Sequence, residues 1–161
     1  MTLFYCSKCG AVLTPELTAL AAVPDPLALP LGSRGRGGEP RRAPSTVPAG
    51  HYAVDPEPWG APFVPRRAGE RPGPARPRGL PVPGDVVSTG TRNTVVVHPD
   101  DVPGLRPPPG GRGDHGCCGP TGADGLNLAC SCGVRLATLA ADCLGPYELH
   151  LDPVRVYAFD A

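Results

Sequence analysis

Two cysteine motifs, separated by about 120 residues, follow the same order of residue types. The first, Cys-Ser-Lys-Cys-Gly, occupies residues 6–10, and the second, Cys-Ser-Cys-Gly, occupies residues 130–133. A close pair of thiols followed by a glycine is typical of a zinc knuckle, and two knuckles can share one tetrahedral ion. The pattern therefore predicts that both ends of the chain meet around a structural zinc. The predicted ligands are Cys6, Cys9, Cys130 and Cys132.

Composition offers few other means of closing the fold. The chain of 161 residues holds 22 Gly and 24 Pro, and only 5% of its residues are aromatic. Glycine and proline at that level are typical of low-complexity sequence. The length would permit one ordinary domain. We nevertheless expect a core of about 60–80 residues, and domains of that size often need a metal or a disulfide.

The setting expected for the seven cysteines favours metal ligands over disulfides. The first residues show neither the basic stretch nor the apolar stretch of a signal peptide. No run approaches the roughly 18 apolar residues of a membrane span. We therefore expect a cytoplasmic protein without membrane contact. Thiols stay reduced in that compartment, and clustered cysteines there indicate a metal site.

The remaining cysteines leave the ligand set open. Further candidate ligands are Cys117, Cys118, Cys143 and His115. Only one residue separates Cys130 from Cys132, which is a tight spacing for two ligands of one ion, so one of them could serve elsewhere. Three interpretations follow: one zinc with spare thiols, two metal sites sharing all seven cysteines, or no metal, with buried or disulfide-bonded cysteines.

Turn-forming residues divide the chain into five parts, whose ordered pieces are expected to form one domain. Residues 1–23 hold the first knuckle and a strand, and residues 24–83 form a low-complexity Pro/Gly/Arg-rich insertion, in which segment 50–60 could dock on the domain. A short strand pair at 84–105 and a linker at 106–113 follow. Residues 114–161 hold the second cysteine-rich knuckle and the last strands.

Apolar runs mark the expected strands. Residues 11–13 follow the first knuckle, although Thr14 and Pro15 also resemble a helix start. The run 94–97 is the clearest strand signal of the middle segment, and 86–87 could pair with it through a hairpin.

Alternation marks the strands near the C-terminus. A strand is expected at 134–139 and a short strand or tail at 154–157. Alternation in 147–151 places Tyr147, Leu149 and Leu151 on the buried face. It places His150 on the solvent face, so this residue, like His51 and His98, is expected to be an ordinary surface histidine.

The cysteine-rich segment also resembles a known pattern. Residues 116–133, with their continuation to the Ala-Asp-Cys of 141–143, are similar to a group of small, uncharacterised, cysteine-rich proteins of actinobacterial type. The first knuckle and residues 52–59 look like parts of the same pattern. This resemblance implies no assigned activity. The paired knuckles also resemble a zinc ribbon, a family that docks onto nucleic acid or protein.

Together these features predict a small all-β fold. Its core would be a zinc-ribbon-like antiparallel sheet built from both chain ends, with a long, irregular Pro/Gly/Arg-rich insertion. Such an insertion is tolerable because each doubling of loop length costs only about 0.6 kcal/mol. Structural zinc offsets that cost, since its apparent binding free energy in small domains is about 10–16 kcal/mol.

The residues do not favour an enzyme, and no catalytic residue is predicted. His115, Asp114 and Cys117 supply the residue types of a cysteine nucleophile with its base, but three such groups within four positions rarely converge in space. The predicted function is a non-catalytic, zinc-stabilised interaction module with an unknown protein partner. One alternative is a thiol-based redox or zinc-responsive regulator. Another is nucleic-acid binding through the nine arginines between residues 34 and 78, although the net charge of the chain is zero.

Overall fold

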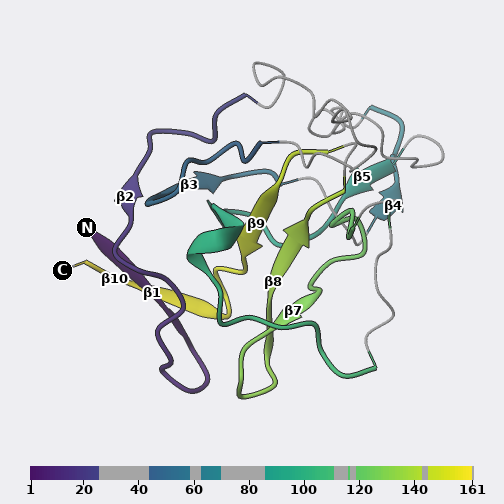
Figure 1. The fold of residues 1–161 in the computed structure, drawn as a ribbon. Coiled ribbons are helices and arrows are strands. Elements are labelled where there is room, and N and C mark those ends of the chain that lie inside the picture. The colour runs from purple at the N-terminus through teal and green to yellow at the C-terminus, as the bar shows by residue number, and fades with distance from the viewer. Residues whose placement is uncertain are drawn as a thin grey trace, which may run out of the picture.

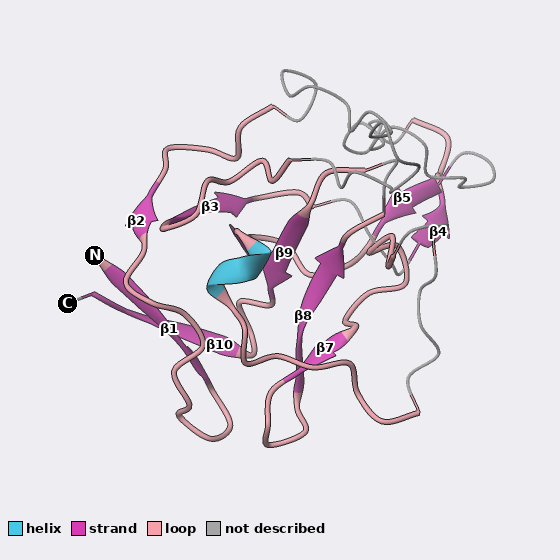
Figure 2. Cartoon of the chain, viewed as in Figure 1, coloured by secondary structure: helices cyan, strands magenta, loops and turns pink. Residues whose placement is uncertain are grey.

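A computed structural model describes residues 1–25, 44–58, 63–69, 86–110, 116, 119–142 and 145–160. The described part is built almost entirely from strands and turns, and its helical structure is a short 3-10 turn, η2 (Pro99–Asp101) (Figures 1 and 2). None of its helical segments is long and apolar enough to cross a membrane. The prediction of a small all-β fold is therefore confirmed.

Six strands form the main sheet, in the order β2-β3-β6-β9-β8-β7. Their bounds are β2 (Thr18–Ala19), β3 (His51–Asp55), β6 (Thr94–Val97), β9 (Glu148–Leu151), β8 (Arg135–Ala140) and β7 (Leu128–Ala129). The short β2 runs parallel to β3, and the other neighbouring pairs are antiparallel. Strand β6 lies in the interior of the sheet and all four of its residues are buried, as expected for a strand covered on both faces.

The expected hairpin between 86–87 and 94–97 is wrong. Strand β5 (Val86–Ser88) pairs with β4 (Phe63–Pro65) in a separate two-stranded sheet, whereas β6 pairs with β3 and β9. The connection between β5 and β6 contains Asn93 with a positive φ of 58°, and the Asn93 N–H donates to the Pro56 carbonyl. This turn directs β6 alongside β3 rather than back along β5.

The two ends of the chain pair with each other. Strand β1 (Thr2–Cys6) runs antiparallel to β10 (Val156–Asp160), so both termini lie at the same side of the molecule (Figure 1). Tyr5 and Tyr157 are directly opposed in this pair, and their rings stack with centroids 5.2 Å apart. This sheet confirms that the fold draws on both chain ends, although the last strand lies at 156–160 rather than 154–157.

One face of the main sheet carries the larger hydrophobic core. Val97, Leu149 and Leu151 project from adjacent strands and pack with Phe4 of β1. Leu149 and Leu151 are at most 1% exposed, and burying a side chain of that size contributes about 1.5–3 kcal/mol. A smaller cluster of Val47, Ala53 and Val96 covers part of the opposite face.

The first knuckle is followed by an irregular segment rather than by the strand expected at 11–13. Val12 forms an isolated bridge with Tyr5, and Leu17 forms another with Thr2, so residues 11–17 run alongside β1 without regular pairing. The Phe4 N–H donates to the Thr14 hydroxyl, and Pro15 follows directly. A side-chain acceptor and a proline at this point interrupt the backbone ladder.

Part of the expected insertion belongs to the main sheet. Segment 50–60 supplies β3, which lies between β2 and β6, and the Tyr52 ring packs edge-on against Phe4 with centroids 5.1 Å apart. The rest of the insertion lies largely outside the described residues, as does the end of segment 50–60.

The strands expected at 134–139 and 147–151 are confirmed as β8 and β9, with Leu149 and Leu151 buried. Two predictions about the side chains of this strand are wrong, however. Tyr147 precedes the strand and is only half-buried, while Glu148 is buried. His150 is not an ordinary surface residue, because its side chain is only 15% exposed. Glu148 and His150, which point away from the core of Leu149 and Leu151, are therefore largely enclosed by other parts of the protein.

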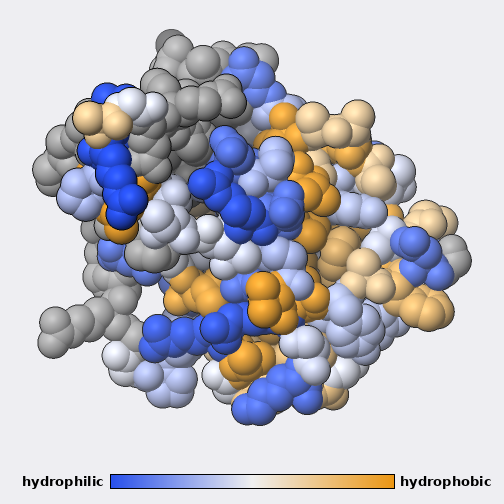
Figure 3. All heavy atoms as spheres, turned by 180° about the vertical axis from the view of Figure 1, so that it is seen from behind, coloured by the Kyte–Doolittle hydropathy of each residue, from blue (hydrophilic) through white to orange (hydrophobic). Residues whose placement is uncertain are grey.

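Apolar residues also reach the surface. The exposed large apolar side chains of the described part are Met1, Val12, Val54, Val64, Val154, Tyr157 and Phe159. Figure 3 shows the molecule from behind the view of Figure 1, with hydrophobic surface interrupted by polar side chains. Scattered exposure of this kind is usual for folded proteins.

Candidate metal centre

The structure brings all four predicted ligands together. Cys6 is the last residue of β1, whereas Cys130 and Cys132 lie in the loop between β7 and β8. This loop and the loop after β1 lie at the same end of the molecule (Figure 1). One candidate ligand atom from each of Cys6, Cys9, Cys130 and Cys132 lies within 4.8 Å of the other three.

The spacing of the sulfurs matches a tetrahedral ion. The Sγ atoms of Cys6 and Cys132 are 3.8 Å apart, and those of Cys9 and Cys130 are 3.7 Å apart. A zinc–sulfur bond of about 2.3 Å gives a tetrahedron with edges of about 3.8 Å. A disulfide would instead require a sulfur–sulfur distance of about 2.05 Å. The arrangement therefore fits four thiolates around one ion, with each contact pairing one cysteine from each knuckle.

The first knuckle is closed by its own backbone. The Gly10 N–H donates to the Cys6 carbonyl at 2.9 Å, and the Cys6 N–H donates to the Ala11 carbonyl at 2.9 Å. Gly10 has a φ of 71°, a region in which residues with a Cβ are strained. The glycine thus allows the chain to turn back under the two sulfurs.

The second knuckle uses the same closure with one residue fewer. The Gly133 N–H donates to the Cys130 carbonyl at 2.8 Å, and the Cys130 N–H donates to the Val134 carbonyl at 2.9 Å. Gly133 has a φ of 85°. The single residue between Cys130 and Cys132 therefore does not keep either thiol away from the other two.

Hydrogen-bond donors around Cys130 stabilise a negative charge on its sulfur. Burial raises the pKa of Cys130, but hydrogen bonding has the larger effect and lowers the pKa to about 7. The groups responsible are the Cys132 backbone and then the side chains of Ser131, Cys9 and Cys6. Near neutral pH the Cys130 sulfur can therefore be a thiolate that accepts hydrogen bonds from its neighbours.

The exposed Cys9 shows the opposite effect. A hydrogen bond with the Ala11 backbone lowers its pKa, but desolvation and the side chains of the other three cysteines raise it to about 12. In the absence of a cation, ionisation of one thiol thus opposes ionisation of the next. A bound divalent ion would remove this opposition, because thiols lose their protons to the metal on binding.

The cluster also closes one end of the hydrophobic core. Cys6 and Cys130 are buried and belong to the same cluster as Phe4 and Leu136, while Cys132 packs against its edge. Cys9 is exposed. All four positions around an ion would be filled by protein sulfur, an arrangement that stabilises a fold and leaves no coordination position for a substrate.

The other candidate ligands lie in segments that the structure does not describe. They are Cys117, Cys118, Cys143 and His115. Of the remaining histidines, His98 accepts the Asp100 N–H through Nδ1, and His51 contacts the Ala49 carbonyl. A second metal site that includes the other candidate ligands stays a prediction.

A second polar cluster was not predicted. On the face of the main sheet opposite the larger core, His150 lies between Thr94, 3.0 Å from its Nδ1, and Glu148, 3.1 Å from its Nε2. The Thr46 hydroxyl donates to the other oxygen of Glu148. Burial raises the pKa of the Glu148 carboxyl, but the hydrogen bond and charge of His150 and the hydrogen bond from Thr46 hold it below its usual value.

Comparisons with known proteins add no family to these findings. No protein-family model matches the chain, and searches of curated proteins and of solved structures found no match. The resemblance to cysteine-rich proteins of actinobacterial type therefore stays a prediction.

Proposed function

We propose that this protein is a non-catalytic interaction module whose fold is held by one structural zinc bound to Cys6, Cys9, Cys130 and Cys132. The observation that carries the proposal is the meeting of four sulfurs from opposite chain ends at the spacing of a tetrahedron. The same four residues join β1 to the β7–β8 loop, so a bound ion would connect the two-stranded sheet of the termini to the main sheet.

The donor set favours zinc in a structural role. Four thiolates in tetrahedral geometry select zinc or iron among common metals. Catalytic zinc sites usually keep one position for water or substrate, whereas structural sites are filled by four protein ligands. The cluster supplies four cysteines and buries two of them in the core. These features support a closed site that stabilises the surface with which a partner interacts.

Metal analysis of the full chain tests this proposal. Protein purified under reducing conditions without added chelator should contain one zinc per chain and little iron by elemental mass spectrometry. Cys9→Ser should lower the zinc content, whereas Val12→Ser, an exposed change beside the same knuckle, should keep it. Absence of zinc from the wild-type protein, or full zinc in every single cysteine variant of the cluster, would contradict the proposed site.

One observation favours a second candidate, a thiol-based redox or zinc-responsive regulator. Cys9 is exposed, and its Sγ lies 3.7 Å from that of the buried Cys130. An accessible sulfur beside a second sulfur is a route to disulfide formation if the metal leaves. Mild peroxide treatment separates the candidates, because a structural site should retain its zinc, while a regulator should release zinc as the thiols oxidise.

Nucleic-acid binding through the insertion stays a prediction. Of the nine arginines between residues 34 and 78, only Arg66 and Arg67 lie within the described residues. Binding driven by these arginines should weaken steeply as salt is raised. Electrophoretic shift assays at two salt concentrations therefore test it, and salt-insensitive or absent binding would remove this alternative.

A further inference from the structure

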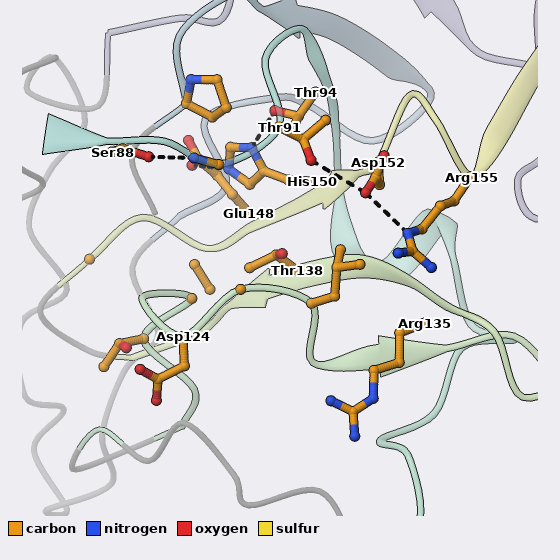
Figure 4. A pocket seen from close by; sticks show the side chains of 18 of the residues that line it. Ser88, Thr91, Thr94, Asp124, Arg135, Thr138, Glu148, His150, Asp152 and Arg155 are labelled. Carbon is orange, nitrogen blue, oxygen red and sulfur yellow. Dashed lines mark hydrogen bonds and ion pairs between the residues drawn. The ribbon is translucent and has the colours of Figure 1, made fainter. Parts of the chain in front are cut away.

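A cavity of about 770 Å³ lies over the face of the main sheet opposite the larger core. Strands β8 and β9 form its floor, where Thr138 and His150 are cross-strand neighbours, and the turn at 121–126 forms another wall. Its size is within the range of small-molecule sites. Figure 4 shows polar and charged side chains of this cavity, among them Thr138, Glu148 and His150.

Much of the polar lining is already engaged within the protein. Both ring nitrogens of His150 have partners, namely Thr94 and Glu148, and Thr46 occupies the second oxygen of Glu148. The carboxylate of Asp152 accepts from the Val154 N–H at 2.8 Å. These contacts hold the side chains of the cavity wall in place, because their polar atoms already have partners within the protein. They do not present free donors or acceptors to a ligand.

Two arginines differ from the rest of the lining. Arg135, an exposed residue, has no ion-pair partner among the described residues. Arg155 contacts the buried Asp152 carboxylate through Nε at 3.4 Å, while its two terminal nitrogens make no further bond within the described part. Asp152 therefore orients the Arg155 side chain without occupying the end of its guanidinium.

Charge is distributed unevenly along the cavity. Arg135 and Arg155 lie at one end, and the exposed Asp124 lies at the other (Figure 4). Glu148 is hydrogen-bonded to His150 and Thr46, and the Asp152 carboxylate forms an ion pair with Arg155. Both guanidinium groups therefore place positive charge at the end of the cavity away from Asp124, and this charge favours an anion at that end.

The two cysteine knuckles hold both arginines in place. Arg135 comes three residues after Cys132, and Gly133 and Val134 line the cavity beside it. The Arg155 carbonyl accepts hydrogen bonds from Ser7 of the first knuckle, from its N–H at 3.0 Å and from its hydroxyl at 2.9 Å. The backbone positions of the two arginines therefore depend on the same loops that carry the sulfurs.

We infer that Arg135 and Arg155 form a binding site for the oxyanion of a small ligand, either a phosphate ester or a carboxylate, in the cavity beside the metal centre. The hydroxyl of Thr138 lines the same cavity and offers a further hydrogen bond, whereas the Thr91 hydroxyl already donates to Asp152 at 3.4 Å. Guanidinium groups suit this role, because they bind carboxylate and phosphate through paired N–H donors. The inference rests on the proposed function, since metal-loaded knuckles position the arginines, and it names the ligand class of the module.

Titration of the zinc-loaded full chain tests the inference. Inorganic phosphate and acetate, a carboxylate that does not chelate zinc, are the probes. Each is added at constant ionic strength and followed by calorimetry or amide chemical shifts. We expect saturable binding of at least one, and the tighter probe identifies the phosphate or carboxylate class. Arg135→Gln and Arg155→Gln should each weaken binding about tenfold or more. Arg92→Gln, which removes an exposed arginine paired with Glu57 outside the cavity, should change it less than about twofold.

Asp124→Asn removes a negative charge from the cavity instead of a positive one. Loss of this carboxylate should leave oxyanion binding unchanged or tighten it. Zinc content and the circular dichroism of each variant establish that the fold is intact before titration. Failure of both probes to saturate below about 10 mM, or binding that both arginine variants leave unchanged, would overturn the inference. If that result occurs with one zinc per chain, the proposed metal site still stands, whereas zinc-free protein contradicts the proposed function itself.

Discussion

Replacing Cys132 by serine removes one ligand of the proposed zinc and should expose how much of the fold depends on the metal. Cys132 lies in contact with Cys6 across 126 residues of sequence. A cross-link that closes a loop of this length restricts the unfolded chain by about 5 kcal/mol. Small domains are stable by only about 5–15 kcal/mol. Loss of the metal link is therefore expected to remove a third or more of the stability.

Unfolding by urea or heat, under reducing conditions, measures this effect. Wild-type protein treated with a strong chelator and Cys132→Ser should unfold at similar midpoints, both well below that of the zinc-loaded wild type. For a chain of 161 residues the difference corresponds to about 10–20 °C in Tm. Val12→Ser, an exposed change beside the first knuckle, should retain both its zinc and its sensitivity to chelator.

Two outcomes would refute this reasoning. Chelated wild-type protein that is free of zinc but unfolds at the original midpoint would show that the core alone holds the chain ends together. Cys132→Ser protein that keeps one tightly bound zinc would show that Cys132 is not a ligand. Cys132 is only half-buried, so lost packing contributes less to the expected result than it would at Cys6.

Further predictions concern the core, the knuckle, the buried acid and the cavity. Leu149→Ala, in the core, should cost about 2–5 kcal/mol in urea unfolding, whereas Val154→Ala, at a position 78% exposed, should change stability by less than about 0.5 kcal/mol. Gly10→Ala meets no atom within 4 Å but must adopt a φ of 71°, so zinc affinity in chelator competition should fall about tenfold, and less for Gly10→Asn. Glu148→Gln should cost about 1–3 kcal/mol at pH 7. Because the folded pKa of Glu148 is lowered, its contribution is present above its usual pKa of about 4.3 and is lost as pH falls through the folded value, so urea midpoints of wild type and variant should converge in acid. Saturating phosphate or acetate should slow removal of zinc by a chelator, and an unchanged rate would show that the cavity and the metal centre are not coupled.

The sequence allowed prediction of features that are encoded locally. Alternation around Leu149 and Leu151 identified β9 and its core face, because each side chain of a strand that packs on a core points to a fixed face. The cysteine spacing likewise singled out the four residues that meet. A turn that brings two thiols together needs a glycine or a similar residue at a definite position, and Gly10 and Gly133 mark that position in both knuckles.

Pairing between distant segments could not be predicted in the same way. Strand β3 is only five residues long and lies between proline-rich flanks, so its sequence resembles the surrounding insertion. Its place beside β6 depends on contacts such as that of Tyr52 with Phe4, which are far apart in the chain. The hairpin expected for β5 and β6 failed for a related reason, because local spacing permits a pairing but the competing partner, β3, is remote.

The cavity was missed because alternation predicts the face of a residue but not what encloses that face. Glu148 and His150 do lie on the side of β9 opposite Leu149, as the pattern indicates. Thr46 and Thr94, which enclose them, come from segments that are 102 and 56 residues away in the chain. A glutamate and a histidine at alternate positions of a strand were the available signal, since such a pair can be buried when its charges are matched.

Hydrogen bonds and short stretches of chain connect the metal centre directly to the cavity. Ser7, between two of the sulfurs, holds the Arg155 carbonyl through two hydrogen bonds, and Arg135 follows the second knuckle within three residues. If zinc orders both knuckles, it also orders both guanidinium groups, and a ligand that bridges them must favour the zinc-loaded form. Thermodynamic linkage makes this effect reciprocal, so zinc must strengthen oxyanion binding by the factor with which the oxyanion strengthens zinc binding. A site built this way would bind its ligand more tightly in the metal-loaded protein, which gives the structural zinc a direct part in recognition.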